Sequence, residues 1–306
     1  MKRWLIFGFV FLLAAGALAL SEARKADAPA SADAVLFFIA DTERELGRLP
    51  FALTRLSDAE EIQLGDEMAQ SAGLSRGGDG NPTDTQVSSY IVRVGRQVAA
   101  RAQRQIPYRF HYIPDRSFVN AFALPGGHVF IGAGLLSMMD SEDQLAAVLG
   151  HEVAHIDRYH CAERVQIEAR TRRIPMGVVF QLAQIPIQIF QAGYSKTQEL
   201  EADSVGLDLA VRASYSPQGA IRLFEKFQQR EGGRAATASS PQEEAARVAA
   251  GAIGGYFRSH PYADERIVEM RRLISQNGWE NRLSEMPLEV WPVFHPASQP
   301  GTFTKP

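Results

Sequence analysis

Polar and apolar positions follow the period of an α-helix in three long stretches of the chain. The first covers residues 57–73 and opens on a capping box made by Ser57 and Glu60. The second covers about residues 84–104. The third opens on a capping box made by Ser141 and Gln144 and runs to about residue 173. We predict a helix for each stretch, because the spacing is helical and capping boxes mark where helices begin.

A different pattern separates the second and third helices. Residues 108–113, 118–123 and 128–131 are rich in aromatic and β-branched side chains, as strands are. Pro125-Gly126-Gly127 makes a turn between the last two. We predict a small antiparallel sheet beside the third helix, in an α+β fold that is mainly helical. The strand around Phe122 would hold an extended peptide by strand addition; the alternative is a sheet that only supports the helix.

Residues 174–194 carry no charge. The glutamines at positions 181, 184, 188 and 191 form a stripe along one side of a helix, and apolar residues lie away from it. Pro175, Pro186 and the glutamines make the segment a poor membrane span. We predict an amphipathic helix packed on the core. A lid over a site and a surface resting on a membrane are the alternatives.

Length, net charge and cysteine content indicate a globular protein without a nucleic-acid-binding surface or an internal disulfide. The 306 residues suffice for a sizeable core, and a net charge of -3 indicates no nucleic-acid-binding surface. Cys161 is the only cysteine, so the chain forms no internal disulfide. We interpret Cys161 as a small half-buried residue rather than a redox group or a metal ligand.

The N-terminus has the layout of a secretory signal. Met1-Lys2-Arg3 is basic, and residues 4–20 form an uncharged, mostly apolar run with Ala17 and Ala19 available for cleavage. The alternative is an uncleaved membrane anchor, because the run is just long enough to span a bilayer. No cysteine follows the run, which excludes a lipoprotein anchor. We expect a location in the bacterial periplasm, soluble or membrane-associated through this segment.

The third predicted helix carries the sequence His151-Glu152-Val153-Ala154-His155. Residues four apart share one face of a helix, so both histidines can reach one metal ion. Neutral imidazoles are ligands that suit zinc. Glu152 lies one residue off that face, where it would act as a general base on water rather than as a ligand. The pattern predicts one Zn²⁺ per chain.

A catalytic zinc site needs a third protein ligand and one open position. Glu199 and Asp203 are four residues apart and share a helix face, whereas Glu201 points elsewhere. We predict that Glu199 is the third ligand and that Asp203 hydrogen-bonds a ligand histidine and fixes its tautomer. The remaining histidines are interpreted as structural, or at most as partners of a ligand: His111, His128, His160 and His295.

Taken together, three motifs resemble the HtpX/BepA-type zinc metallopeptidases, which include the CAAX prenyl protease and belong to the gluzincins. They are the segment from Asn120 to Gly127, the HExxH sequence, and Glu199 with Ala202 and Asp203. His260-Pro261, with Arg266 downstream, is a fourth match. The resemblance implies a zincin-like fold with His151, His155 and Glu199 as zinc ligands and Glu152 as catalytic base. For His260 it implies either a latch on the open zinc position or help in stabilising the transition state.

The chain also departs from these relatives. HtpX-like members have several membrane spans, and BepA-like members continue into a tetratricopeptide array that has no counterpart here. The likeness is greatest to short, single-domain periplasmic members. We expect a signal or anchor at 1–20, a linker and N-terminal segment at 21–56, a metallopeptidase domain at 57–275 and a tail at 276–306.

These observations predict a zinc-dependent endopeptidase that acts on misfolded or misassembled envelope proteins. Its substrates would be proteins or peptides. The tetrahedral oxyanion needs a donor, for which His260 is the first candidate, followed by Tyr256 and Tyr262. The alternative function is a latched, non-catalytic, zinc-stabilised binding or chaperone-like factor of the envelope, in which His260 would close the metal site as a fourth ligand.

Overall fold

The computed structural model describes residues 54–74, 81–176, 178–191, 193–232, 263–280 and 286–294. Backbone contacts divide the chain into residues 1–53 and residues 54–306, and every described residue belongs to the second unit. No helix in the described ranges is long and apolar enough to cross a membrane. The predicted signal or anchor at 1–20 lies outside these ranges, and the expected domain boundaries stay predictions.

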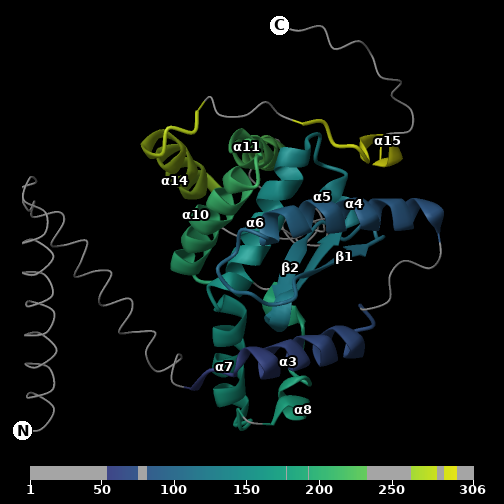
Figure 1. Ribbon diagram of the computed structural model, residues 1–306, viewed down its shortest axis with the longest axis vertical. Helices are drawn as coiled ribbons and strands as arrows, with labels where there is room; N and C mark the ends of the chain where they lie inside the picture. Colours follow the sequence, from purple (N-terminus) through teal and green to yellow (C-terminus); the bar gives the residue numbers. More distant parts are fainter. Residues whose placement is uncertain are drawn as a thin grey trace, which may run out of the picture. The chain divides into compact units, whose positions relative to one another are not determined.

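Helices make up most of the described chain (Figure 1). Their bounds are α3 (Asp58–Ser71), α4 (Pro82–Ala99), α5 (Ala133–Leu136), α6 (Glu142–Asp157), α7 (His160–Arg172), α8 (Val179–Leu182), α9 (Gln188–Gln191), α10 (Lys196–Arg212), α11 (Gln218–Gly232), α14 (Ala263–Gln276) and α15 (Trp291–Phe294). The capping box predicted for the first helix is confirmed, with Ser57 and Glu60 bonded in both directions. At the start of α6 only half of the predicted box forms, because the side chain of Gln144 bonds Asp140 instead of returning to Ser141.

The sheet is mixed rather than antiparallel, which corrects the prediction. Its strands are β1 (Arg109–Ile113), β2 (Ala121–Leu124) and β3 (His128–Gly132), in the order β1-β3-β2. The turn at Pro125–Gly127 makes β2 and β3 an antiparallel pair, as expected. The connection from β1 carries the chain past the position of β3, so β3 enters between the other two and pairs with β1 in parallel.

The turn between β2 and β3 requires glycine for two reasons. Gly126 and Gly127 have φ values of 75° and 106°, a region that other residues rarely adopt. A Cβ atom at either position would also lie within 2.4 Å of a backbone oxygen, that of Glu61 or that of Pro107. The turn can therefore pack directly against the backbone of α3 at Glu61.

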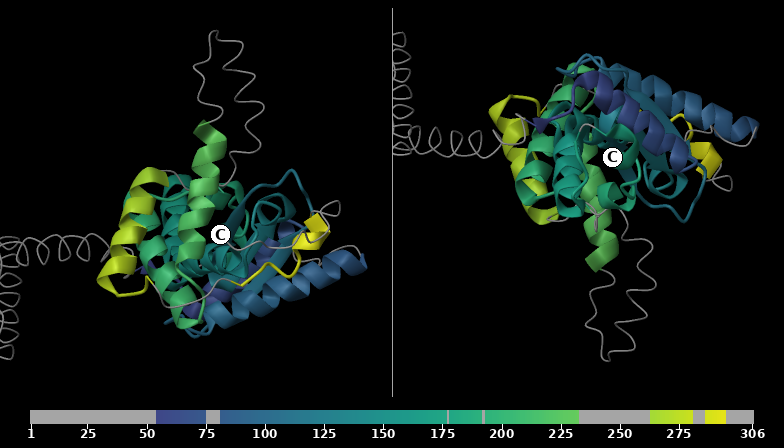
Figure 2. Two further views of the ribbon diagram at one scale, coloured as in Figure 1. Left: turned by 90° about the horizontal axis from the view of Figure 1, so that it is seen from above. Right: turned by 90° about the horizontal axis from the view of Figure 1, so that it is seen from below.

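Helix α6 lies at the centre of the fold (Figure 1). The sheet and α4 lie on one side of it, and α10, α11 and α14 pack around the other (Figures 1 and 2). Fifteen of the sixteen residues of α6 are buried, polar ones included. A helix that is buried all round cannot be recognised by amphipathic periodicity alone, and its buried polar residues need partners from the surrounding elements.

The third predicted helix is interrupted at Arg158 and Tyr159, contrary to the prediction of one helix to residue 173. Tyr159 has a left-handed backbone with φ of 64°. Its ring lies beneath the guanidinium groups of Arg55 and Arg104, at 3.4 and 4.0 Å from the ring centroid. These contacts hold Tyr159 in that conformation, and α7 begins at His160.

The single amphipathic helix predicted for residues 174–194 is also wrong. The segment contains two short helical turns, α8 and α9, because proline at 175 and 186 supplies no backbone N–H for a continuous helix. Its packing on the core is confirmed by the burial of Leu182, Ile185 and Phe190. Helix α9 contacts β2, whose four residues are all buried. Peptide addition at β2 stays a prediction.

Candidate metal centre

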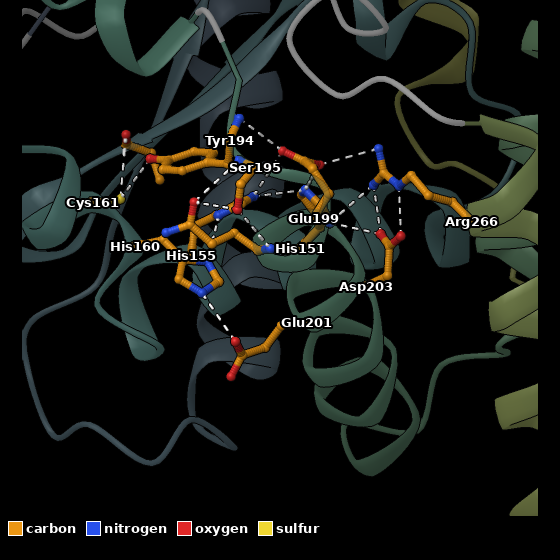
Figure 3. Close-up of polar contacts among 12 residues, drawn as sticks. His151, His155, His160, Cys161, Tyr194, Ser195, Glu199, Glu201, Asp203 and Arg266 are labelled. Carbon is orange, nitrogen blue, oxygen red and sulfur yellow. Dashed lines mark hydrogen bonds and ion pairs between the residues drawn. The ribbon is translucent and has the colours of Figure 1, made fainter. Parts of the chain in front are cut away.

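Two helices bring three potential metal ligands together. His151 and His155 project from α6, and Glu199 projects from the first turn of α10 (Figure 3). The two Nε2 atoms lie 3.0 Å apart, and the carboxylate oxygens of Glu199 lie 3.4 Å from His151 Nε2 and 3.8 Å from His155 Nε2. Ligand atoms that share one tetrahedral zinc ion are separated by roughly 3.3 Å. The cluster therefore has the donor types and the spacing of a three-residue zinc site.

The contact between α6 and α10 depends on two facing glycines. A Cβ atom on Gly206 would lie 2.6 Å from the backbone nitrogen of His151, and one on Gly150 would lie 2.6 Å from the carbonyl oxygen of Gly206. The helices approach so closely because neither position carries a side chain. Glu199 is two turns before Gly206 on α10, so this contact sets its distance from the histidines.

The second ring nitrogen of each histidine also has a partner. His151 Nδ1 lies 2.9 Å from Asp203 Oδ1, as the sequence predicted for Asp203. His155 Nδ1 lies 2.9 Å from His160 Nδ1, and His160 Nε2 lies 3.4 Å from Glu201. Such partners orient the ring and select which nitrogen faces a metal. The break at Tyr159 turns His160 back toward His155, a position that a continuous helix would not have given it.

Arg266 of α14 completes the group around His151. Its guanidinium donates two hydrogen bonds of 2.6 Å to the Asp203 carboxylate and lies 3.4 Å from Glu199. The side chain is completely buried and lies over the ring of Phe224. Asp203, 63 positions before Arg266 in the sequence, thus links the guanidinium to His151, whose Nδ1 also lies 3.3 Å from it.

Charges in this group shift its proton equilibria. Burial favours neutral Asp203, but the charge of Arg266 and its hydrogen bonds outweigh that effect and hold the pKa of Asp203 below its ordinary value. Burial likewise opposes the charged form of His151, but hydrogen bonds from the ring to Asp203 and Glu199 raise its pKa to about 9. The surroundings of His151 are therefore built to favour positive charge at that ring, whether from a proton or from a metal ion.

Tyr194 borders the same cluster and was not singled out from the sequence. Its ring stacks on His155 with centroids 4.0 Å apart, and its backbone N–H donates to Glu199 Oε1 over 3.3 Å. Its hydroxyl lies 3.3 Å from Cys161 Sγ. Burial, followed by the thiol and the Glu152 charge, raises the pKa of Tyr194 well above its usual value. The sequence could have indicated Tyr194 through its position directly before Ser195, the N-cap of the helix that carries Glu199.

Glu152, which follows His151 in the sequence, is completely buried. Burial is the main cause of the raised pKa of Cys161 and of Tyr194, and the charge of Glu152 adds to it in both groups. His260, Tyr256, Tyr262 and His295 lie outside the described residues. His111 and His128, interpreted as structural, lie in the sheet, where their ring nitrogens are 2.9 Å apart.

Residues 84–274 match the family described as Peptidase family M48, and this match covers most of the chain, including the whole histidine and glutamate cluster. The chain belongs to peptidase family M48. The resemblance to HtpX/BepA-type metallopeptidases is thereby confirmed, as is the mainly helical α+β fold.

Three relatives show the range of M48 proteins to which the chain is similar. The mitochondrial metalloendopeptidase OMA1 of Schizosaccharomyces pombe is 30% identical over 223 residues, which cover 70% of this chain and 59% of that protein. The beta-barrel assembly-enhancing protease of Escherichia coli (strain K12) is 27% identical over 269 residues, covering 81% and 49%. Metalloprotease LoiP of the same strain is 25% identical over 244 residues, covering 76% and 87%.

The chain spans about half of the length of the first two relatives and most of the length of the third. All three are named as proteases, which favours an enzyme over the non-catalytic alternative. Within this M48 chain, His151, His155 and Glu199 form the candidate metal site of the described residues.

Proposed function

We propose that this chain is a zinc-dependent endopeptidase of the bacterial envelope that cleaves misfolded or misassembled proteins. One observation carries the proposal: within the M48 match, two helices place His151, His155 and Glu199 at the mutual distances of zinc ligands, with Glu152 buried beside them. Two imidazoles and one carboxylate leave one of four tetrahedral positions open, as catalytic zinc sites do.

The residues fit zinc better than magnesium or calcium. Magnesium and calcium prefer shells made of oxygen atoms, whereas this cluster offers two nitrogens and one carboxylate. A zinc ion held there would polarise the scissile carbonyl and lower the pKa of a bound water molecule to near 7. We propose one Zn²⁺ per chain.

The chain's own residues supply the proton transfers. Glu152 accepts a proton from the attacking water and then delivers it to the leaving amine. Asp203 and His160 hold the rings of His151 and His155 in the tautomer that presents Nε2 to the metal. His260 remains our first candidate to stabilise the oxyanion, and the extended substrate would lie along β2 near Phe122.

The proposed substrates and location rest on two supports. A relative from Escherichia coli is named for enhancing β-barrel assembly, which favours envelope proteins that have failed to assemble. Residues 1–20 have the layout of a secretory signal, which favours the periplasm, either as a soluble protein or held at the membrane by that segment. Cell fractionation and the mass of the mature N-terminus test both points. A full-length chain in the cytoplasm would contradict them.

The activity is tested with the purified, zinc-loaded full chain on casein and on an unfolded outer-membrane protein. Glu152→Gln should lower the rate by a factor of about 10² to 10⁴ while zinc content stays unchanged, because it removes the general base and no ligand. Glu168→Gln on α7, which removes a partly buried carboxylate paired with Arg172 and is not part of the metal cluster, is the matched control and should leave the rate unchanged. Absence of cleavage by the parent, or equal rates in parent and Glu152→Gln, would refute the proposal.

A further inference from the structure

An apolar and cationic surface, which we call the α7–α8 tip, lies where α7 ends and α8 follows, at the bottom of Figure 1. Its apolar members are Ile167, Val178 and Phe180, and all three are exposed. Phe180 is the most exposed large apolar residue of the described chain, at 71%. Within the described residues only Val268 and Met286 are exposed in the same way, so these side chains concentrate at the tip.

The cationic members of the tip are Arg170, Arg172 and Arg173, all exposed at the end of α7. Arg172 pairs with Glu168, whereas Arg170 and Arg173 form no ion pair with any described residue. Residues 169–198 contain no aspartate or glutamate. Because the whole chain has a net charge of -3, the tip is a local reversal of the charge of the molecule.

The packing of α8 holds Phe180 in its exposed position. Leu182 of the same helical turn is completely buried in the core, and α8 contacts α3. With Leu182 on the inner side of the turn, Phe180 cannot also turn inward without unwinding α8. An exposed phenylalanine held in this way loses contact with water only when something covers it.

A bilayer surface is the partner that suits this combination of side chains. Surfaces that rest on membranes place aromatic and aliphatic side chains about 5–10 Å into the headgroup boundary and keep Arg or Lys at the anionic headgroups. Helix α8 is a single turn, so Phe180 can enter that boundary without any spanning element. The unpaired Arg170 and Arg173 supply the charge that anionic phospholipids attract.

The chain enters the described structure next to the same helix. The side chain of Thr54 accepts a hydrogen bond of 3.2 Å from Gln166, one turn before Arg170 on α7. Residues 4–20, whose sequence predicts a signal or an anchor, lie upstream of Thr54. If that run stays in a membrane, it keeps the tip at the same membrane at a high effective concentration.

We propose that the α7–α8 tip docks on the anionic surface of a phospholipid bilayer, with Phe180 and Val178 in the headgroup boundary and the arginines at lipid phosphates. Helix α7 then acts as a spacer. It begins at His160, which contacts the metal-ligand candidate His155, and its 13 residues are about 20 Å long. The candidate metal centre is thus held within roughly that distance of the bilayer, where it meets protein segments beside the membrane. Docking itself does not depend on peptidase activity.

The test places an NBD fluorophore, which brightens in apolar surroundings, on Gln181→Cys in the full-length chain. Gln181 is exposed and follows Phe180, and the natural Cys161 is completely buried and escapes labelling. Vesicles of phosphatidylethanolamine and phosphatidylglycerol should raise the NBD emission and shift it to shorter wavelength, and vesicles of phosphatidylcholine should do so far less. The same label on Val268→Cys of α14 should not respond, because that helix lies away from the tip (Figure 1).

Substitutions at the tip then separate its two components. Phe180→Ser should lower the equilibrium constant for insertion of the label about tenfold. Val268→Ser is the matched control, because Val268 is 67% exposed but lies outside the tip, and it should change nothing. Arg170→Gln with Arg173→Gln should lower insertion into phosphatidylglycerol vesicles about 25-fold at low salt, or about fivefold for each arginine. Arg212→Gln, an exposed arginine at the end of α10, is the control for charge.

Two results would overturn the proposal. An emission that is already shifted without vesicles would show that the tip is covered by another part of the chain or, if dilution reverses the shift, by a second copy. A chain that sediments with phosphatidylglycerol vesicles while the label at Gln181→Cys does not respond would be held there by residues 1–53 without the tip. The zinc-loaded Glu152→Gln chain should dock as the parent does, so loss of cleavage and loss of docking are read separately.

Discussion

Replacing Arg266 by methionine tests whether the buried network around His151 acts as a unit. Arg266 is completely buried and bonds both carboxylate oxygens of Asp203 at 2.6 Å. Two unit charges at about 4 Å attract by about 4 kcal/mol at an effective dielectric constant near 20. Removing one partner of such a pair leaves a buried charge without compensation, which destabilises proteins by about 3–5 kcal/mol. We expect a loss of that size in the free energy of unfolding.

The same variant should weaken metal binding. Asp203 fixes the ring of His151, and Arg266 fixes Asp203. Loss of such partners of a ligand lowers metal affinity by about 10–100-fold. Zinc affinity is measured by competition with a chelator, and stability by urea unfolding followed by circular dichroism. Arg271→Met, on the same helix but in an exposed pair with Glu225, is the control and should change stability by less than about 1 kcal/mol.

A double-mutant cycle with Asp203→Asn supplies the decisive comparison. Once Asp203 is neutral, removing Arg266 no longer strands a carboxylate, so the two losses in stability should not add. We expect an interaction energy of about 2–3 kcal/mol. Additive losses, or a zinc affinity unchanged in Arg266→Met, would refute the argument that Arg266 acts on His151 through Asp203.

Two further predictions follow from close packing and from proton binding. Gly206→Ala should lower the free energy of unfolding by about 1–3 kcal/mol and also weaken zinc binding, because its Cβ would push α10 away from the backbone of His151. Unchanged zinc affinity in a calorimetric titration would count against this role of Gly206. Stability should also fall as pH drops from about 6.5 to about 4. Burial and the neighbouring ring of His128 lower the pKa of His111 to about 4, so in that window the unfolded chain binds protons that the folded chain does not. For His111 the loss in the free energy of unfolding is roughly 2–3 kcal/mol. His111→Phe, which can still stack on Phe130, should reduce the dependence of that free energy on pH by the same amount, measured by urea unfolding at each pH. An identical pH dependence in the variant would show that other groups titrate there.

Local spacing accounts for the parts of the site that the sequence predicted. His151 and His155 share a face because both lie on one unbroken helix, and Glu199 and Asp203 share a face for the same reason. Predicting those two pairs required only the period of the α-helix and the chemistry of zinc ligands. The capping box at Ser57 was equally local, and it formed as predicted.

The errors arise where distant residues decide local structure. The helix ends at Asp157 because Tyr159 is held by Arg55 and Arg104, which come from segments before α3 and after α4 and give no signal near residue 159. That break is what places His160 behind His155. The parallel pairing of β1 with β3 depends on the path of the connection between β1 and β2, which the alternation of side chains within a strand does not reveal.

The site is therefore a product of packing between elements that are remote in sequence. The metal-facing atoms come from α6 and α10, but the groups that orient the ligand rings come from α7, α10 and α14. Arg266 belongs to α14, so a fragment ending before residue 263 would retain every predicted ligand and lose the cation that balances Asp203 and Glu199. Two buried carboxylates would then lack their counter-charge, which destabilises the folded arrangement of the ligands. Helices α6 and α10 supply the ligands, but α14 makes their buried arrangement stable.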